Sequence, residues 1–289
     1  MKLNRSNDKK QNSTKSSFLP RDAAEFLKKV SYCENNYLSY YRFGQYQTTV
    51  KRGKEEVVVE HFRYRRSCNN LSKSEILQSL RKRQELIVSQ LPAYMKFHYK
   101  LNGRILLGIG GVTPYTTISA MTLHPVYGIP YIPGSSLKGV VRNYWLHEHL
   151  DGDLGLGENA SRKVFFDKCF GTGADDEQLS SGKLIFLDAY PVETYQIVKD
   201  VQTPHYKTYY NQKGSSPPRD DDSPNIIPLM AIEDTIFDIY IGMNFKTDEL
   251  DANLRNEISK TIISTLSEYG VGAKTAIGYG LGEVTMCDS

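Results

Sequence analysis

Two cations one helical turn apart, Lys138 and Arg142, are the first residues of this chain whose types and spacing could do chemistry. They follow a Pro-Gly turn in the segment IPGSSLKGVVR, whose two serines are residues that commonly cap a helix N-terminus. A helix that begins there would present backbone amides and two positive charges to an anion such as a phosphate chain. The alternative is an exposed cation pair with no ligand. The residues that would form this anion site are Gly134, Ser135, Ser136, Lys138, Gly139 and Arg142.

A glycine-rich stretch at 270–282, with the sequence GVGAKTAIGYGLG, is the second candidate. Glycine at this density allows positive φ and brings backbone N–H groups within reach of an anion; the alternative is a set of tight turns between a helix and a strand. The spacing fits neither a P-loop nor a dinucleotide-binding fingerprint. The candidate anion contacts here are Gly270, Gly272, Lys274, Thr275, Gly278, Tyr279 and Gly280.

Histidines are the candidates for proton transfer, because no Ser-His-Asp or Cys-His arrangement can be defended from the sequence. The chain has six histidines, of which His124 and His205 are two candidates; each could be a general acid-base group, a hydrogen-bonded structural residue or a nucleic-acid contact. Tyr206 and Tyr279 could stack on bases or pack in the interior. The acidic run 175–177 does not have the spacing of a calcium loop, so we expect no metal site. We also expect no cofactor and no catalytic residue.

Charge is distributed unevenly. Residues 1–104 hold 22 Lys and Arg against 9 Asp and Glu, whereas the whole chain holds 36 against 33. A basic first third indicates a polyanionic partner or an acidic neighbouring surface, although a solvated face would look the same.

The start of the chain lacks a signal-peptide pattern, there is no run of apolar residues long enough to cross a membrane, and the four cysteines are far apart. These features favour a reduced, cytoplasmic setting away from membranes.

The elements that must position these residues follow from hydrophobic periodicity. We expect a strand over 94–103, a helix from 135, a strand over 182–190, a strand over 237–245, a helix over 248–269 and a strand over 278–285. This order is β-α-β-β-α-β, so the predicted class is α+β with a ferredoxin-like, or RRM-like, core.

The remaining segments are expected to be additions to that core. Residues 1–17 have the composition of a disordered tail, and 18–92 would be a basic helical elaboration with helices over 21–32 and 72–90. In the second helix we expect Arg81 to be exposed and Ile87 to face inward. Residues 50–57 read as a hairpin or an exposed loop. The core would span 93–289, with a long irregular insertion at about 192–231.

The two candidate segments together resemble the RAMP superfamily of CRISPR-associated proteins. Further stretches, including TLH at 122–124, YGIPY at 127–131, FLDAYP at 186–191 and TPHY at 203–206, are similar to the sixth subunits of Cmr-type (type III-B) effector complexes. The resemblance covers roughly residues 94–285. It implies a ferredoxin-like fold and RNA-backbone contacts by Lys138, Arg142 and the loop from Gly270 to Gly280. It implies as partners the guide RNA, the target RNA, other RAMP subunits and the small subunit.

The resemblance also implies that the chain is not catalytic. The related backbone subunits cleave RNA with an aspartate in the loop after the first strand, and the corresponding stretch here, 108–133, has no acidic residue. We therefore expect a structural RNA-binding subunit near the 3′ end of the guide that caps the filament in antiviral defence. The alternative is a RAMP-type endoribonuclease in which His124 or His205 supplies the acid-base chemistry.

Overall fold

An antiparallel sheet organises residues 93–287, in the order β10-β4-β9-β5, with the short β6 also paired to β9. The computed structural model describes residues 15–16, 21–29, 35–42, 45–51, 54–60, 71–111, 119–150, 160–172, 180–203, 209, 217, 227–246 and 249–287. The strands are β4 (Ala93–Leu101), β5 (Leu184–Phe186), β6 (Tyr190–Pro191), β9 (Ile236–Met243) and β10 (Gly282–Cys287). The expected strand over 182–190 is thus divided into β5 and β6.

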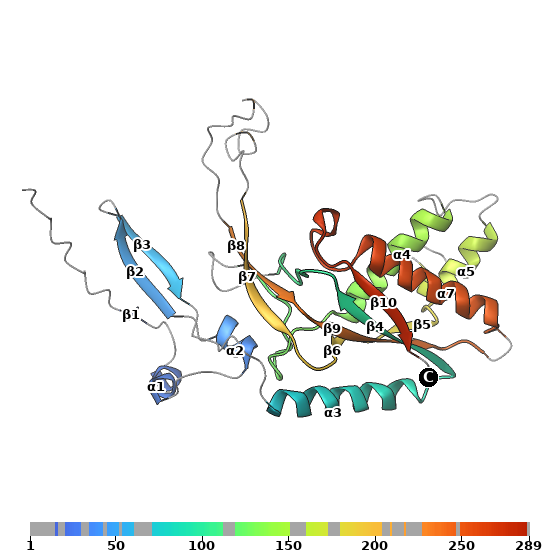
Figure 1. Ribbon diagram of the computed structural model, residues 1–289, viewed down its shortest axis with the longest axis horizontal. Helices are drawn as coiled ribbons and strands as arrows, with labels where there is room; N and C mark the ends of the chain where they lie inside the picture. Colours follow the sequence, from blue (N-terminus) through green and yellow to red (C-terminus); the bar gives the residue numbers. More distant parts are fainter. Residues whose placement is uncertain are drawn as a thin grey trace, which may run out of the picture.

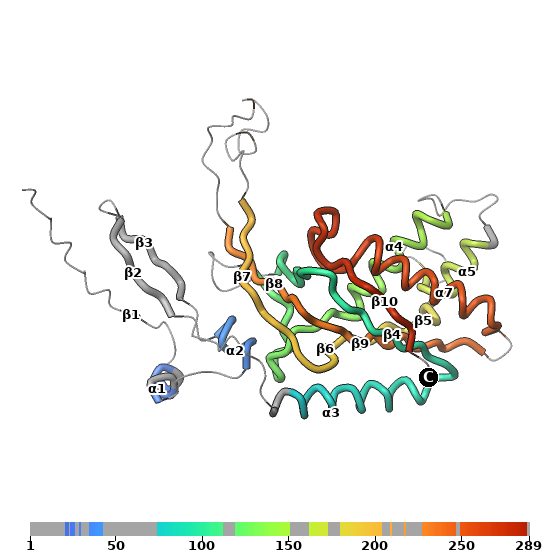
Figure 2. The backbone as a smooth tube through the Cα atoms, viewed as in Figure 1, coloured from blue at the N-terminus to red at the C-terminus, as the bar shows by residue number. Residues whose placement is uncertain are grey.

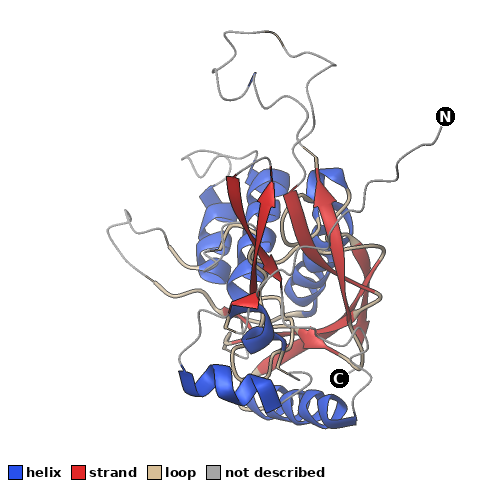
Figure 3. Ribbon diagram, turned by 90° about the vertical axis from the view of Figure 1, so that its left-hand side faces the viewer, coloured by secondary structure: helices blue, strands red, loops and turns tan. Residues whose placement is uncertain are grey.

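Three helices cover one face of this sheet: α4 (Gly134–Leu150), α5 (Ala160–Phe170) and α7 (Ala252–Ser264). Figure 1 shows them on the side opposite α3 (Leu71–Val88), and Figure 3 shows the same separation after a turn of the molecule. Asp251 caps the N-terminus of α7 by accepting the Leu254 N–H at 2.7 Å. A π-helical turn, Thr265–Tyr269, continues α7 up to Gly270. The predicted helix over 248–269 therefore ends where expected but begins later, at Ala252.

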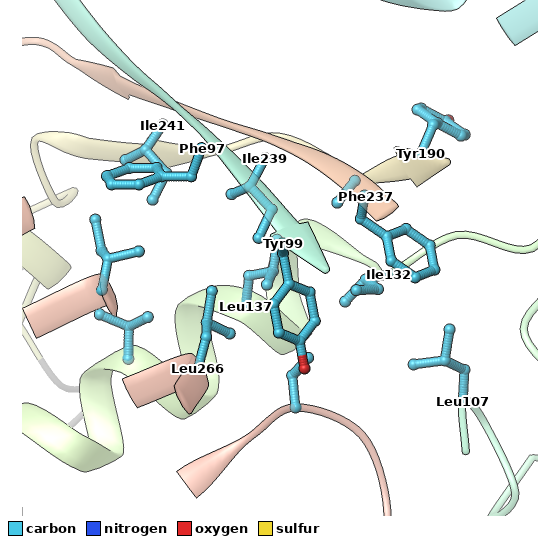
Figure 4. Packing of buried hydrophobic residues seen from close by; sticks show 14 of the residues in the cluster. Phe97, Tyr99, Leu107, Ile132, Leu137, Tyr190, Phe237, Ile239, Ile241 and Leu266 are labelled. Atoms are coloured by element: carbon cyan, nitrogen blue, oxygen red, sulfur yellow. The ribbon is translucent and has the colours of Figure 1, made fainter. Parts of the chain in front are cut away.

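The core fills the space between the sheet and these helices. Alternate residues of β4 and β9 point into it, because successive side chains of a strand point to opposite faces. Figure 4 shows Tyr99 from β4 near Leu137 of α4 and Leu266, while Phe97 lies next to Ile241 of β9. The neighbouring β4 residues Lys96 and His98 are only partly buried and lie on the other face.

Helix α3 covers part of that other face through charged and polar contacts. The Arg81 Nε atom lies 2.8 Å from Oδ2 of Asp238, a carboxylate that is 4% exposed, and His98 Nε2 lies 3.0 Å from Oδ1. The expectation that Arg81 is exposed was therefore wrong, because a buried carboxylate needs a cationic partner. Ile87 was expected to face inward but is 43% exposed, whereas Val88 is buried.

The N-terminal part contains strands as well as helices. Helices α1 (Arg21–Lys29) and α2 (Asn36–Tyr41) precede a hairpin of β2 (Gln45–Lys51) and β3 (Lys54–Glu60), and β1 (Lys15–Ser16) pairs with β2. Of the two interpretations of 50–57, the hairpin is the one observed. The hairpin strands extend beyond the predicted 50–57, so the region 18–92, expected to be mainly helical, contains strands at 45–51 and 54–60 as well.

The expected irregular insertion begins and ends as an ordered ribbon. Strand β7 (Gln196–Gln202) pairs antiparallel with β8 (Ile227–Glu233) along its whole length. The ribbon extends away from the central sheet (Figure 1). The expectation of irregular structure was wrong for these strands because the prolines at 204–224 lie between them, and Pro228 occupies a strand position.

Candidate nucleic-acid interface

The start of α4 is built around a carboxylate. The Gly134 N–H donates to Oδ1 of Asp188 at 2.8 Å, and the N–H groups of Ser136 and Leu137 donate to the Pro133 carbonyl. A negative charge at a helix N-terminus is favourable because it meets the positive end of the helix dipole. The sequence-based expectation of open amides at this helix start was therefore wrong, since the protein itself occupies most of them.

The glycines of this helix have different roles. A Cβ at Gly134 would clash with the carbonyl oxygen of Phe186, so this glycine is needed for close packing of the chain on itself. A Cβ at Gly139 would meet nothing within 4 Å, and this residue is exposed. Only Gly139 leaves room for a ligand backbone to approach the helix. Ser135 and Ser136 are exposed in the first turn and are not the cap, because the helix begins at Gly134.

The two cations of α4 differ in their surroundings. The Arg142 guanidinium lies over the buried Phe166 ring, with 4.9 Å between Cζ and the ring centroid. Such stacking holds one face of the guanidinium and leaves its edge for other contacts. Lys138 is half-buried and has no partner among the described residues. Of the two cations, Lys138 is therefore the one whose charge is more available to a ligand.

Most backbone groups of the 270–282 loop are used inside the protein. The N–H groups of Val271 and Gly280 donate to the carbonyls of Gly280 and Arg104, at 2.9 and 2.8 Å. A Cβ at Gly270, Gly272 or Gly280 would lie too close to backbone oxygens of the protein, and all three residues have positive φ. These glycines are thus needed for tight turns, whereas Gly278 has open space around it.

The tip of the loop has a different backbone. Lys274 adopts a left-handed conformation, with φ of 62°, and a 3₁₀ turn over Thr275–Ile277 follows it. Among the described residues, no protein group accepts a hydrogen bond from the N–H groups of Lys274, Thr275 or Ala276. A left-handed residue followed by a right-handed one points successive N–H groups into a concavity that suits an anion. The predicted anion-binding role of the loop is thus narrowed to this tip.

Sequence reasoning missed the polar contacts that join the loop to the ribbon. The Tyr279 hydroxyl donates to Oδ2 of Asp200 on β7 at 2.8 Å, and Arg104 lies 3.3 Å from Asp200 and 2.8 Å from Glu233. Burial raises the pKa of Asp200, but the hydrogen bonds from Tyr279, the Val201 N–H and Arg104 outweigh it and hold this pKa below its ordinary value. No local pattern signals these contacts, because the partners are far apart in the chain.

His124 lies in an aromatic cluster near the start of α4. Its ring stacks on Tyr127 with 4.4 Å between centroids, and it is 6.0 Å from Tyr131. Its Nδ1 atom accepts the N–H groups of Val126 and Tyr127, each at 3.3 Å. Burial lowers the pKa of His124, which outweighs the opposing effect of Asp188. This geometry fits the structural alternative for His124, while His205 and Tyr206 lie outside the described residues.

The two candidate segments meet the same core. Leu137 of α4, Leu266 and Val271 belong to one buried cluster, and Figure 4 shows Leu137 beside Leu266. The ring of Tyr144 on α4 lies 4.9 Å from that of Tyr269, at the entry to the glycine loop. Both segments therefore lie on the helix-covered face of the sheet. In the part of the chain that the structure describes, no group of His, Cys, Asp and Glu could hold a metal, and no helix is long and apolar enough to cross a bilayer.

Comparison with known proteins gives consistent results. The family model of the RAMP superfamily matches residues 107–283. The CRISPR system Cmr subunit Cmr6 of Pyrococcus furiosus is 28% identical, over 63% of this chain and 65% of that protein. The subunit of the same name from Saccharolobus solfataricus is 26% identical, over 70% and 62% respectively. The chain thus spans slightly less than two thirds of the length of these curated relatives.

Among solved structures, a chain from a CRISPR effector complex has a similar fold. It is a chain of a type III-B Cmr-beta complex bound to cognate target RNA, with a TM-score of 0.54 and 22% identity over 75% of this chain and 68% of that chain. At this identity, the similarity concerns the fold.

Proposed function

Because this chain belongs to the RAMP superfamily, we propose that it is a non-catalytic RNA-binding subunit of a type III-B CRISPR effector complex. Its two curated relatives are Cmr6 subunits, which supports this assignment. In this proposal the partners are guide RNA, target RNA, other RAMP subunits and the small subunit, and the chain caps the filament near the 3′ end of the guide.

The strand order supports a fold of the ferredoxin-like, or RRM-like, type. The elements β4, α4, β5, β9, α7 and β10 follow one another as β-α-β-β-α-β, if β6, the helix α5 and the ribbon are set aside as additions. The sheet order β10-β4-β9-β5 places the first and third core strands in the middle. In this arrangement, the start of α4 and the connection from α7 to β10, which carry the candidate residues, lie on the same side of the sheet.

The observation that carries the proposal is the tip of the glycine loop. Three successive backbone N–H groups at 274–276 have no acceptor among the described residues, and Lys274 adds a positive charge beside them. Lys138, also without a described partner, lies on α4, which covers the same face of the sheet. Contacts of this kind hold an RNA backbone without selecting its sequence, which is what a guide of variable sequence requires.

Salt-dependent binding tests this proposal. The probe is a fluorescein-labelled single-stranded RNA, and the measured quantity is the slope of log Kd against log salt concentration. Lys138→Ala and Lys274→Ala should each weaken binding and reduce the slope by about 0.7, the value expected for one phosphate contact on a single strand. Lys260→Ala, which changes an exposed lysine on α7, is the matched control and should leave the slope unchanged. Slopes that stay at the wild-type value in both test variants would remove these lysines from the interface.

The endoribonuclease alternative has a separate test. The protein is incubated with guide and target RNA, first without and then with a divalent metal. We expect no cleavage, because the Nδ1 atom of His124 already accepts two backbone N–H groups and burial disfavours its protonated form. Specific cleavage that is lost in His124→Ala or His205→Ala would establish the alternative instead.

A further inference from the structure

Residues 104–106 join the glycine loop to the base of the β7–β8 ribbon. On one side, the Gly280 N–H donates to the Arg104 carbonyl at 2.8 Å and the Ala273 N–H donates to the Leu106 carbonyl at 2.9 Å. On the other side, Ile105 and Ile232 exchange two backbone hydrogen bonds, at 2.9 and 3.0 Å. Figure 2 shows the loop curling beside the segment that leaves β4. The three segments therefore form one junction.

Side chains connect the same parts a second time. Asp200 on β7 is 12% exposed, and its Oδ2 atom accepts the Tyr279 hydroxyl and lies 3.3 Å from the Arg104 guanidinium. Arg104 also reaches Glu233 on β8 at 2.8 Å. We name the four residues Arg104, Asp200, Glu233 and Tyr279 the clamp. Asp200 is its centre, because it is the member that touches both the loop residue and the arginine.

A small apolar cluster lies at this junction. Leu106, Leu229 and Ala231 are buried together, and Val198, Ala273 and Tyr279 pack against them. The cluster thus contains residues of the ribbon, of the joining segment and of the glycine loop. A two-stranded ribbon is marginally stable alone, so its direction must be set by contacts at its base. The clamp and this cluster supply those contacts.

We propose that Asp200 is a positioning residue that holds the Lys274 tip against the ribbon in one fixed geometry, so that the tip is already in place when it meets the RNA. This inference rests on the proposed RNA-binding function and adds to it a residue that does not itself contact RNA. Its physical basis is preorganisation: a binding element that is already held in place loses less freedom when the ligand binds. A carboxylate is unfavourable next to phosphate, so a direct RNA contact is the wrong role for Asp200.

Asp200→Asn gives a test in which two effects have opposite signs. The change removes a negative charge, which alone would tighten RNA binding, but it also breaks the ion pair with Arg104. We expect binding of the labelled single-stranded RNA to weaken about fivefold, the size of one typical lost hydrogen bond, with no change in the salt slope. Glu193→Gln, which removes an exposed carboxylate just before β7, is the control for charge. Tyr279→Phe removes one hydroxyl and no charge, and should weaken binding in the same direction.

Amide hydrogen exchange gives the second readout, measured on the full chain without RNA. In both Asp200→Asn and Tyr279→Phe we expect faster exchange in 196–202 and in 270–280 together, with melting of the rest of the chain unchanged. Binding in Asp200→Asn that equals or exceeds that of Glu193→Gln would overturn the proposal, as would a reduced salt slope. If the wild-type chain binds no RNA, the proposed function fails, and exchange then decides alone: coupled acceleration supports the fixed geometry, and unchanged exchange refutes it.

Discussion

The Gly134 N–H donates a 2.8 Å hydrogen bond to Oδ1 of Asp188, so a carboxylate from the segment between β5 and β6 closes the first turn of α4. An anion that the protein supplies thus occupies the place where a phosphate was expected from the sequence. Asp188 also links α4 to α3, because its backbone carbonyl accepts a hydrogen bond from the Gln84 side chain of α3.

Substitution of Asp188 separates the capping effect from the charge effect. Asp188→Ala should lower the free energy of unfolding by about 1 kcal/mol, as loss of a helix cap usually does. Asp188→Asn keeps an acceptor for the Gly134 N–H and should cost about 0.5 kcal/mol through the helix dipole. Because it removes a negative charge beside α4, it should also tighten RNA binding. Denaturant unfolding and RNA titration measure the two effects, and weaker RNA binding by Asp188→Asn would contradict the placement of RNA at this helix.

The two glycines of α4 provide a matched pair of substitutions. Gly134→Ala puts a Cβ against the Phe186 carbonyl and should destabilise the fold by about 1–3 kcal/mol. Gly139→Ala meets no atom within 4 Å and should stabilise the helix by up to about 1 kcal/mol. If RNA approaches α4 at this point, Gly139→Ala should nevertheless bind RNA more weakly. Thermal unfolding and RNA binding measured on the same samples check both parts, and unchanged RNA affinity would exclude close approach at Gly139.

Lys274→Gly distinguishes the lysine charge from the backbone turn. A left-handed conformation is unfavourable for lysine and free of strain for glycine, so this variant should be more stable by up to about 1 kcal/mol. The turn and its N–H groups remain while the charge is lost, so the salt slope of RNA binding should fall by about 0.7. An unchanged slope with normal affinity would mean that the backbone alone holds the anion. Lys274→Ala is the comparison, since it removes the charge and keeps the strain.

His124 should make the fold sensitive to mild acid. Its pKa in the folded protein lies below the ordinary value of 6.5, chiefly because of burial, so the unfolded chain binds a proton first as pH falls. Stability should therefore decrease as pH falls through about 6.5 and level off below the folded pKa. Protonation also removes the Nδ1 acceptor of the 124–127 turn. His124→Asn keeps an acceptor that does not titrate, and a pH dependence equal to that of the wild type in this variant would disprove the assignment.

The sequence by itself determined the elements of the core. Periodicity predicted strands over 94–103 and 237–245, since alternate apolar residues must face the interior, and the structure has them as Ala93–Leu101 and Ile236–Met243. It also singled out Lys138 and Lys274, and the RAMP resemblance that it carries is confirmed by the family match.

Only the tertiary structure decided how those residues are used. Arg81, expected at the surface, pairs with a carboxylate on β9, and Arg104 and Tyr279 meet Asp200 from distant parts of the chain. Spacing reports which residues share one face of a helix or strand. Which charges meet across elements depends on how those elements pack, and a carboxylate that becomes buried takes whichever cation the fold brings near it.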